Sequence, residues 1–69
     1  MGQVYKSIEM VGTSEASFDD AVRGAVKRAS ESMRDLEWFE VCEQRGYIRD
    51  GGIREFQVTV KLWFKLEQG

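Results

Sequence analysis

The clearest pattern in the chain is an alternation of apolar and polar residues near its C-terminal end. Between residues 56 and 66, one parity carries only apolar side chains: Phe56, Val58, Val60, Leu62, Phe64 and Leu66. A period of two residues is typical of a strand with one buried face. Because this alternation is the most regular in the chain, we expect residues 53–66 to form the central strand of a sheet.

Two further segments predict strands. Residues 4–10 alternate imperfectly between apolar and polar positions, and residues 38–48 form a second long strand. Asp50-Gly51 joins this second strand to residues 53–66, and it is a dipeptide favoured in two-residue type I′ hairpin turns. The chain therefore predicts a long antiparallel hairpin in its C-terminal half.

That turn also predicts a register between the two strands of the hairpin. Apolar pairs then meet on one face, with Phe39 opposite Leu62 and Val41 opposite Val60. The other face pairs Trp38 with Trp63, Glu40 with Lys61, Cys42 with Thr59 and Gln44 with Gln57. In this register Arg45 shares the apolar face and points inward unless a bulge turns it out.

A helical period separates the first strand from this hairpin. Ser17 is a candidate N-cap, and Asp20 places an acid in the first turn. The apolar residues that recur at helical spacing are Phe18, Ala21, Val22, Ala25, Val26, Ala29, Met33 and Leu36. We expect a helix over residues 17–35, and its alanines allow it to lie close against a sheet.

Together these elements predict an α+β fold and a single domain over residues 1–69. The expected order is β-α-β-β, with a three-stranded antiparallel sheet in the order 1-3-2 and the helix packed on its apolar face. The opposite face then carries aromatic residues among its charges, namely Tyr5, Trp38 and Trp63. Such residues mark an interface or a ligand site, or they form a simple cross-strand aromatic pair.

Composition narrows the classes of function. A chain of 69 residues buries a small core, and a lone cysteine with no histidine gives neither an internal disulfide nor an ordinary zinc site. Oligomerisation is the remaining means of stabilisation.

The net charge of −2, with scattered basic residues, argues against nucleic acid as a partner. No apolar stretch approaches the roughly 20 residues that span a bilayer, so we expect a cytoplasmic protein that does not contact membranes.

Three segments resemble the signature of the dodecins: residues 36–41 (Leu-Glu-Trp-Phe-Glu-Val), Arg45-Gly46, and residues 56–59 (Phe-Gln-Val-Thr). The opening residues, Val4-Tyr5-Lys6 with Val11-Gly12-Thr13-Ser14, are also similar to that family. The resemblance covers nearly the whole chain. It implies a βαββ protomer, a hollow homo-dodecamer, and binding of riboflavin, FMN or FAD.

The resemblance also implies roles for four residues. Trp38 matches a tryptophan that stacks on the isoalloxazine ring, with two flavins held between two symmetry-related copies. Gln57 matches a glutamine that hydrogen-bonds the polar edge of the ring, and Arg45 matches an arginine beside the pocket. Lys65 matches a basic residue, more often arginine, near the ribityl chain or phosphate. Coenzyme A is left open as a further ligand.

Trp63 departs from the family, which commonly has glycine there, and the predicted register places it directly across from Trp38. It either extends the aromatic surface or fills the space that a flavin needs; we expect binding to be retained, because Trp38, Gln57 and Arg45 are present.

The function implied is flavin storage and photoprotection. The alternative is an oligomeric scaffold in which both tryptophans only stabilise subunit contacts. An enzyme ranks last, because no histidine or Gly-rich phosphate loop is present and stacking blocks both flavin faces.

Overall fold

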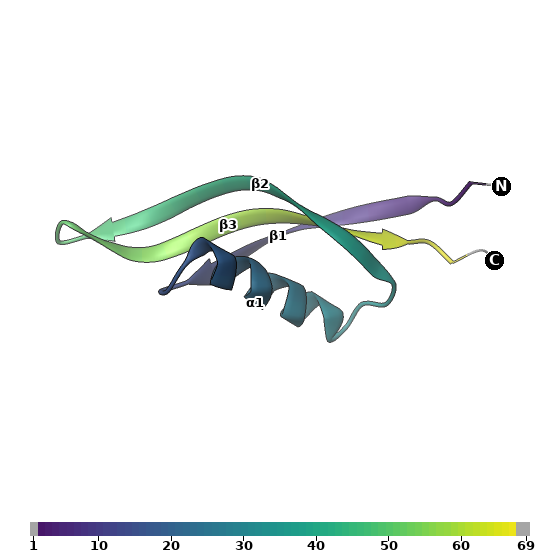
Figure 1. Cartoon of the computed structure of the whole chain (residues 1–69), viewed down its shortest axis with the longest axis horizontal. Coiled ribbons are helices and arrows are strands. Elements are labelled where there is room, and N and C mark those ends of the chain that lie inside the picture. Colours follow the sequence, from purple (N-terminus) through teal and green to yellow (C-terminus); the bar gives the residue numbers. More distant parts are fainter. Residues whose placement is uncertain (1, 68–69) are drawn as a thin grey trace.

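The computed structural model describes residues 2–67 and contains one helix and three strands in the order that the sequence predicts. These are β1 (Tyr5–Ser14), α1 (Phe18–Ser30), β2 (Leu36–Arg49) and β3 (Gly52–Lys65). All pairings are antiparallel, and the strand order β1-β3-β2 places β3 at the centre. Figure 1 shows α1 on one side of the sheet and the β2–β3 hairpin reaching well beyond it. The predicted βαββ fold is confirmed.

The core lies between the alanine stripe of α1 and the central strand. Ala21, Ala25 and Ala29 are buried against the inner residues of β3, and the whole buried apolar core is Ala21, Ala25, Ala29, Val58, Val60 and Leu62. Gly12 of β1 sits directly under the helix, where an added Cβ would collide with the carbonyl oxygen of Ala21. Small residues on both elements therefore allow α1 to lie close to the sheet.

The start of α1 follows the predicted capping chemistry. Ser17 has an extended backbone, and its Oγ accepts a hydrogen bond from the backbone nitrogen of Asp20 at 3.0 Å. The Asp20 carboxylate in turn accepts a hydrogen bond of 2.8 Å from Ser14 Oγ, at the end of β1. The cap thereby ties the first turn of the helix to the first strand.

The end of α1 differs from the prediction, because the helix stops at Ser30 and not near residue 35. Asp35 adopts a φ of 62°, a left-handed conformation that turns the chain into β2. Met33 and Leu36 still pack against the core, although they lie outside the helix. Their apolar spacing therefore reflects burial in a connecting segment and in the first residue of β2.

The hairpin turn is at Asp50-Gly51, as predicted. Asp50 has a φ of 52° and Gly51 a φ of 78°, so both central residues are left-handed, as type I′ turns require. Arg49 pairs with Gly52 on either side of the turn. The turn chemistry of this dipeptide therefore fixes the closed end of the hairpin.

The predicted register holds at the two ends of the hairpin and is wrong in its middle. Trp38 pairs with Trp63, and Val41 with Val60, as expected. A bulge at Cys42 then shifts the register by one residue, so that the predicted pairs Cys42–Thr59 and Gln44–Gln57 do not form. The pairs observed instead are Glu43–Thr59, Gln44–Val58 and Arg45–Gln57.

The physical reason for this correction is the hydrogen bonding of Arg45. An unbulged strand would direct its guanidinium toward the helix side, away from the Gln57 and Thr59 side chains that accept its hydrogen bonds on the outer face. The bulge at Cys42 turns Arg45 to the outer face of the sheet, opposite the helix. A second irregularity, which skips Arg54 between the pairs Tyr47–Glu55 and Ile48–Ile53, restores the original register before the turn.

Candidate ligand-binding site

Three aromatic side chains gather on the outer face of the sheet, and we refer to Tyr5, Trp38 and Trp63 as the aromatic cluster. The Trp38 and Trp63 rings are stacked, with centroids 5.7 Å apart and an interplanar angle of 18°. Tyr5 contacts Trp38 at 4.8 Å with a tilt of 56°. Trp38 nevertheless keeps 46% of its surface exposed, so a flat aromatic ligand can still reach this indole.

Trp63 is held in place by a hydrogen bond as well as by stacking. Its indole Nε1 donates to Glu40 Oε1 at 2.7 Å. Trp38 and Glu40 are alternate residues of β2 and therefore point to the same face, and Trp63 lies across from Trp38 on β3. Trp63, the residue that departs from the family pattern, is thus fixed within the aromatic cluster by both stacking and hydrogen bonding.

The polar residues of the predicted site form a second group, farther along the sheet. Arg45 Nε donates to Gln57 Oε1 at 3.0 Å, and Arg45 Nη1 donates to Thr59 Oγ1 at 3.0 Å. Gln57 Nε2 donates to Glu55 Oε1 at 2.9 Å. These bonds orient the amide of Gln57, which keeps one N–H and one oxygen lone pair for a ligand that both donates and accepts.

The structure does not bring all four predicted site residues together within one protomer. Gln57 and Trp63 are six residues apart on β3, which corresponds to about 20 Å along an extended strand. Trp38 lies opposite Trp63, and exposed Lys65 is two residues farther on, so both belong to the aromatic end. Arg45 and Gln57 form the polar end. A single isoalloxazine therefore cannot contact both ends of the same protomer.

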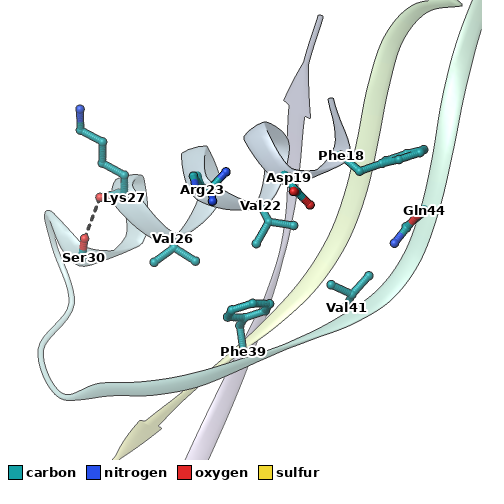
Figure 2. Close-up of a pocket in the computed structure, with 10 residues that line it drawn as sticks. All are labelled: Phe18, Asp19, Val22, Arg23, Val26, Lys27, Ser30, Phe39, Val41 and Gln44. Carbon is teal, nitrogen blue, oxygen red and sulfur yellow. Dashed lines mark hydrogen bonds between the residues drawn. The ribbon is translucent and has the colours of Figure 1, made fainter. Parts of the chain in front are cut away.

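An open apolar groove, which the sequence pattern does not predict, lies on the helix side of the sheet. It has a volume of about 650 Å³ and separates α1 from β2. Figure 2 shows Phe39 and Val41 projecting from β2 toward Val22 and Val26 of the helix. Phe39 is 50% exposed and Val41 42% exposed. The groove exists because α1 packs on β1 and β3 and leaves β2 uncovered.

Within residues 2–67, no group of three or more histidine, cysteine, aspartate or glutamate side chains is placed to hold a metal ion. The helix of this same part of the chain is too short and too polar to cross a membrane. The candidate site offers aromatic stacking, amide hydrogen bonding and guanidinium charge.

The fold and the site define a class of small βαββ protein that presents an exposed aromatic cluster on the open face of its sheet and an uncovered apolar groove on the other. Comparison with known families agrees with this class. A sequence model described as Dodecin matches residues 4–67, and the chain therefore belongs to the dodecin family. The predicted family is confirmed.

Individual relatives match over nearly the full length. The chain is 47% identical to the Dodecin of Thermus thermophilus over 68 residues, which cover 99% of each chain. It superposes on the structure of dodecin from Streptomyces coelicolor with a TM-score of 0.91 and 49% identity, covering 97% of this chain and 96% of that one. A calcium dodecin from Mycobacterium tuberculosis, described as having a novel calcium-binding site, gives a TM-score of 0.80 at 33% identity, covering 96% of this chain and 94% of that one.

Proposed function

We propose that this chain is a cytoplasmic flavin-storage and photoprotection protein that acts as a hollow homo-dodecamer. The observation that carries the proposal is the half-exposed indole of Trp38 on the outer face of the sheet. Isoalloxazine is a wide, flat aromatic ring, and tryptophan offers it a large matching face. Riboflavin, FMN and FAD share this ring and are the proposed ligands.

A homo-oligomer is proposed because one protomer holds only part of the site. Stacking on a single aromatic contributes about 1–3 kcal/mol, judged from nucleobases, whereas nanomolar binding requires about 12 kcal/mol. A second copy placed across a symmetry axis adds a second Trp38 and brings a polar end, with Arg45 and Gln57, close to the ring. The apolar groove at Phe39 and Val41 offers further surface for subunit contacts.

Photoprotection follows from the same contact. A tryptophan in van der Waals contact with the ring can donate an electron to the excited flavin and so quench it before it generates reactive oxygen. Stacking on both faces also leaves no room for a substrate, so we propose a binding protein and not an enzyme.

The direct test is a titration of riboflavin, FMN and FAD with the purified protein, followed by flavin fluorescence and accompanied by native mass spectrometry. We expect strong quenching with saturation at a fixed ratio of flavin to protomer, on a particle of twelve chains' mass. An oligomer that leaves flavin emission unchanged would overturn the proposal.

Arg45→Ala is expected to weaken flavin binding while leaving quenching at saturation unchanged. Arg45 orients the amide of Gln57 through a 3.0 Å hydrogen bond, and hydrogen bonds to charged groups contribute about 1.5–3 kcal/mol, so the dissociation constant should rise at least about tenfold. Fluorescence titration measures both quantities. Arg54→Ala is the matched control, since Arg54 pairs with Glu15 away from the site. If the Arg45 variant and the native chain bind flavin with equal affinity, the orientation of Gln57 by Arg45 does not contribute to binding.

The alternative function is an oligomeric scaffold that excludes flavin, and the observed stacking of Trp63 on Trp38 favours it. Trp63→Gly separates the two functions, because it opens the space across from Trp38. Under the storage function, the native chain and Trp63→Gly both quench riboflavin. If the native chain fails to bind and Trp63→Gly binds, Trp63 fills the ligand space and the scaffold function is correct for the native chain.

A further inference from the structure

Trp63 stacks on Trp38, and its indole N–H is hydrogen-bonded to the carboxylate of Glu40. Trp63 is nearly parallel to Trp38, and its Nε1 donates to Glu40 Oε1 at 2.7 Å. We propose that Trp63 and Glu40 form an electron and proton relay, in which an electron lost by Trp38 is replaced from Trp63 while the indole proton of Trp63 passes to Glu40. The role of this relay in flavin photochemistry rests on the proposed function; the relay itself does not.

The ring geometry favours Trp63 over Tyr5 as the electron donor to Trp38. The Trp38 and Trp63 rings are inclined by only 18°, which allows their π systems to overlap across the stack. Tyr5 is close to Trp38 but tilted by 56°, so its overlap is poorer. A tyrosine must also release its phenolic proton when it is oxidised, which adds a requirement that an indole does not share.

The position of Glu40 sets the direction of transfer. Its carboxylate is in direct contact with the Trp63 indole, where its negative charge stabilises positive charge on that ring. Glu40 faces Lys61 in the strand register, yet the three ion pairs within residues 2–67 do not include Glu40. The carboxylate is therefore directed to the indole nitrogen and is available to accept its proton.

The relay balances in electrons and protons. An excited isoalloxazine, or an added photo-oxidant, removes one electron from Trp38 and leaves a radical cation. One electron then passes from Trp63 to Trp38, which restores the closed-shell indole of Trp38. Oxidised Trp63 is acidic at its indole nitrogen, so its N–H bond breaks and a new O–H bond forms on Glu40. The products are a neutral Trp63 radical and a neutral Glu40 carboxyl group.

The relay changes what happens after oxidation of Trp38. With Trp38 alone, the oxidised centre stays against the ligand, and the electron returns at once. With the relay, the oxidised centre lies one ring farther away and has lost its proton, so return requires the proton to move back as well. Charge separation should therefore last longer than in a chain that lacks Trp63.

The test uses the assembled protein without flavin, oxidised by laser flash with tris(bipyridine)ruthenium(II) and hexaammineruthenium(III) as quencher. Transient absorption distinguishes the tryptophan radical cation from the neutral radical, and electron paramagnetic resonance identifies the radical trapped on freezing. In the native protein we expect the neutral radical to form promptly. In Glu40→Gln, which keeps a hydrogen-bond acceptor but not a base, its formation should slow about 100-fold or more.

Two further variants identify the route. Trp63→Phe should leave the radical cation on Trp38, and Trp38→Phe should lower the yield of neutral radical because the more exposed indole is lost. Glu9→Gln is the matched control, because Glu9 also faces Lys61 on the outer side of the sheet and its removal changes charge alone. It should behave as the native protein.

Unchanged formation of the neutral radical in Glu40→Gln or in Trp63→Phe would overturn the relay, and an undiminished yield in Trp38→Phe would remove its electron-transfer step. Circular dichroism of each variant checks that the fold is retained. Because the oxidant is a ruthenium complex, these results do not depend on flavin binding, which the fluorescence titration measures separately.

Discussion

Trp38→Ala is expected to restore the fluorescence of flavin in the presence of the protein and to weaken binding by about 10- to 100-fold. The estimate follows from a loss of about 1–3 kcal/mol of stacking per ring, with about 1.4 kcal/mol for each factor of ten. Trp38 is the exposed member of the aromatic cluster, and removal of its indole takes away both the stacking surface and the electron donor. Fluorescence titration measures the affinity and the residual emission together.

Tyr47→Ala provides the matched control for this variant. Tyr47 is an equally exposed aromatic residue of β2, at the far end of the hairpin from Trp38. It should leave flavin quenching unchanged, and native mass spectrometry should show the same assembly for both variants. A Trp38→Ala protein that still quenches flavin as the native chain does would contradict the role given to Trp38.

Leu62→Ala is expected to lower the free energy of unfolding by about 2–5 kcal/mol. Leu62 is 2% exposed and belongs to the core between β3 and the helix, so its truncation leaves a cavity that α1 cannot fill. In a domain whose total stability is about 5–15 kcal/mol, this loss leaves a large share of the chains unfolded at moderate urea concentration. Urea denaturation followed by circular dichroism, at one fixed protomer concentration, measures the change.

The control for this core substitution lies four residues along the chain. Leu66 has the same side chain but follows β3 and is 39% exposed, so Leu66→Ala should change the unfolding free energy by less than about 0.5 kcal/mol. If the two variants lose equal stability, the core does not lie where the structure places it, and the oligomer interface dominates the unfolding.

The fold could be predicted because its strongest local signals agree with its topology. The Asp50-Gly51 turn, the alternation along β3 and the Ser17 cap each specify a local conformation, and all three occur as expected. The end of α1 could not be located from spacing alone. Met33 and Leu36 continue the apolar period of the helix, although the helix ends at Ser30 and the left-handed Asp35 then turns the chain into β2.

The site was only partly predictable, because the sequence does not show how far apart its residues lie in one chain or how much of the sheet the helix covers. The resemblance to the dodecins assigns four residues to one pocket: Trp38, Gln57, Arg45 and Lys65. Within one chain, however, Gln57 and Trp63 are separated by about 20 Å along the extended strand β3. The apolar groove was missed because an alternating strand was expected to lie wholly beneath the helix. The alanines of α1 bring it close to β1 and β3 but make it too narrow to cover β2 as well.

Two of the three register irregularities of the hairpin, at Cys42 and Arg54, shift the pairing by one residue in opposite directions. One extra residue at Cys42 on β2 is cancelled by one extra residue at Arg54 on β3, so only the segment between them is displaced. Inside that segment, residues 43–47 exchange their inward and outward sides, while Trp38 and the turn keep theirs. If Cys42 and Arg54 were instead both paired as ordinary strand residues, Arg45 would return to the helix side while the tryptophan pair kept its register. The orientation of Arg45 and Gln57 relative to one another is thus set by these two bulges, independently of the pairing that places Trp38 against Trp63.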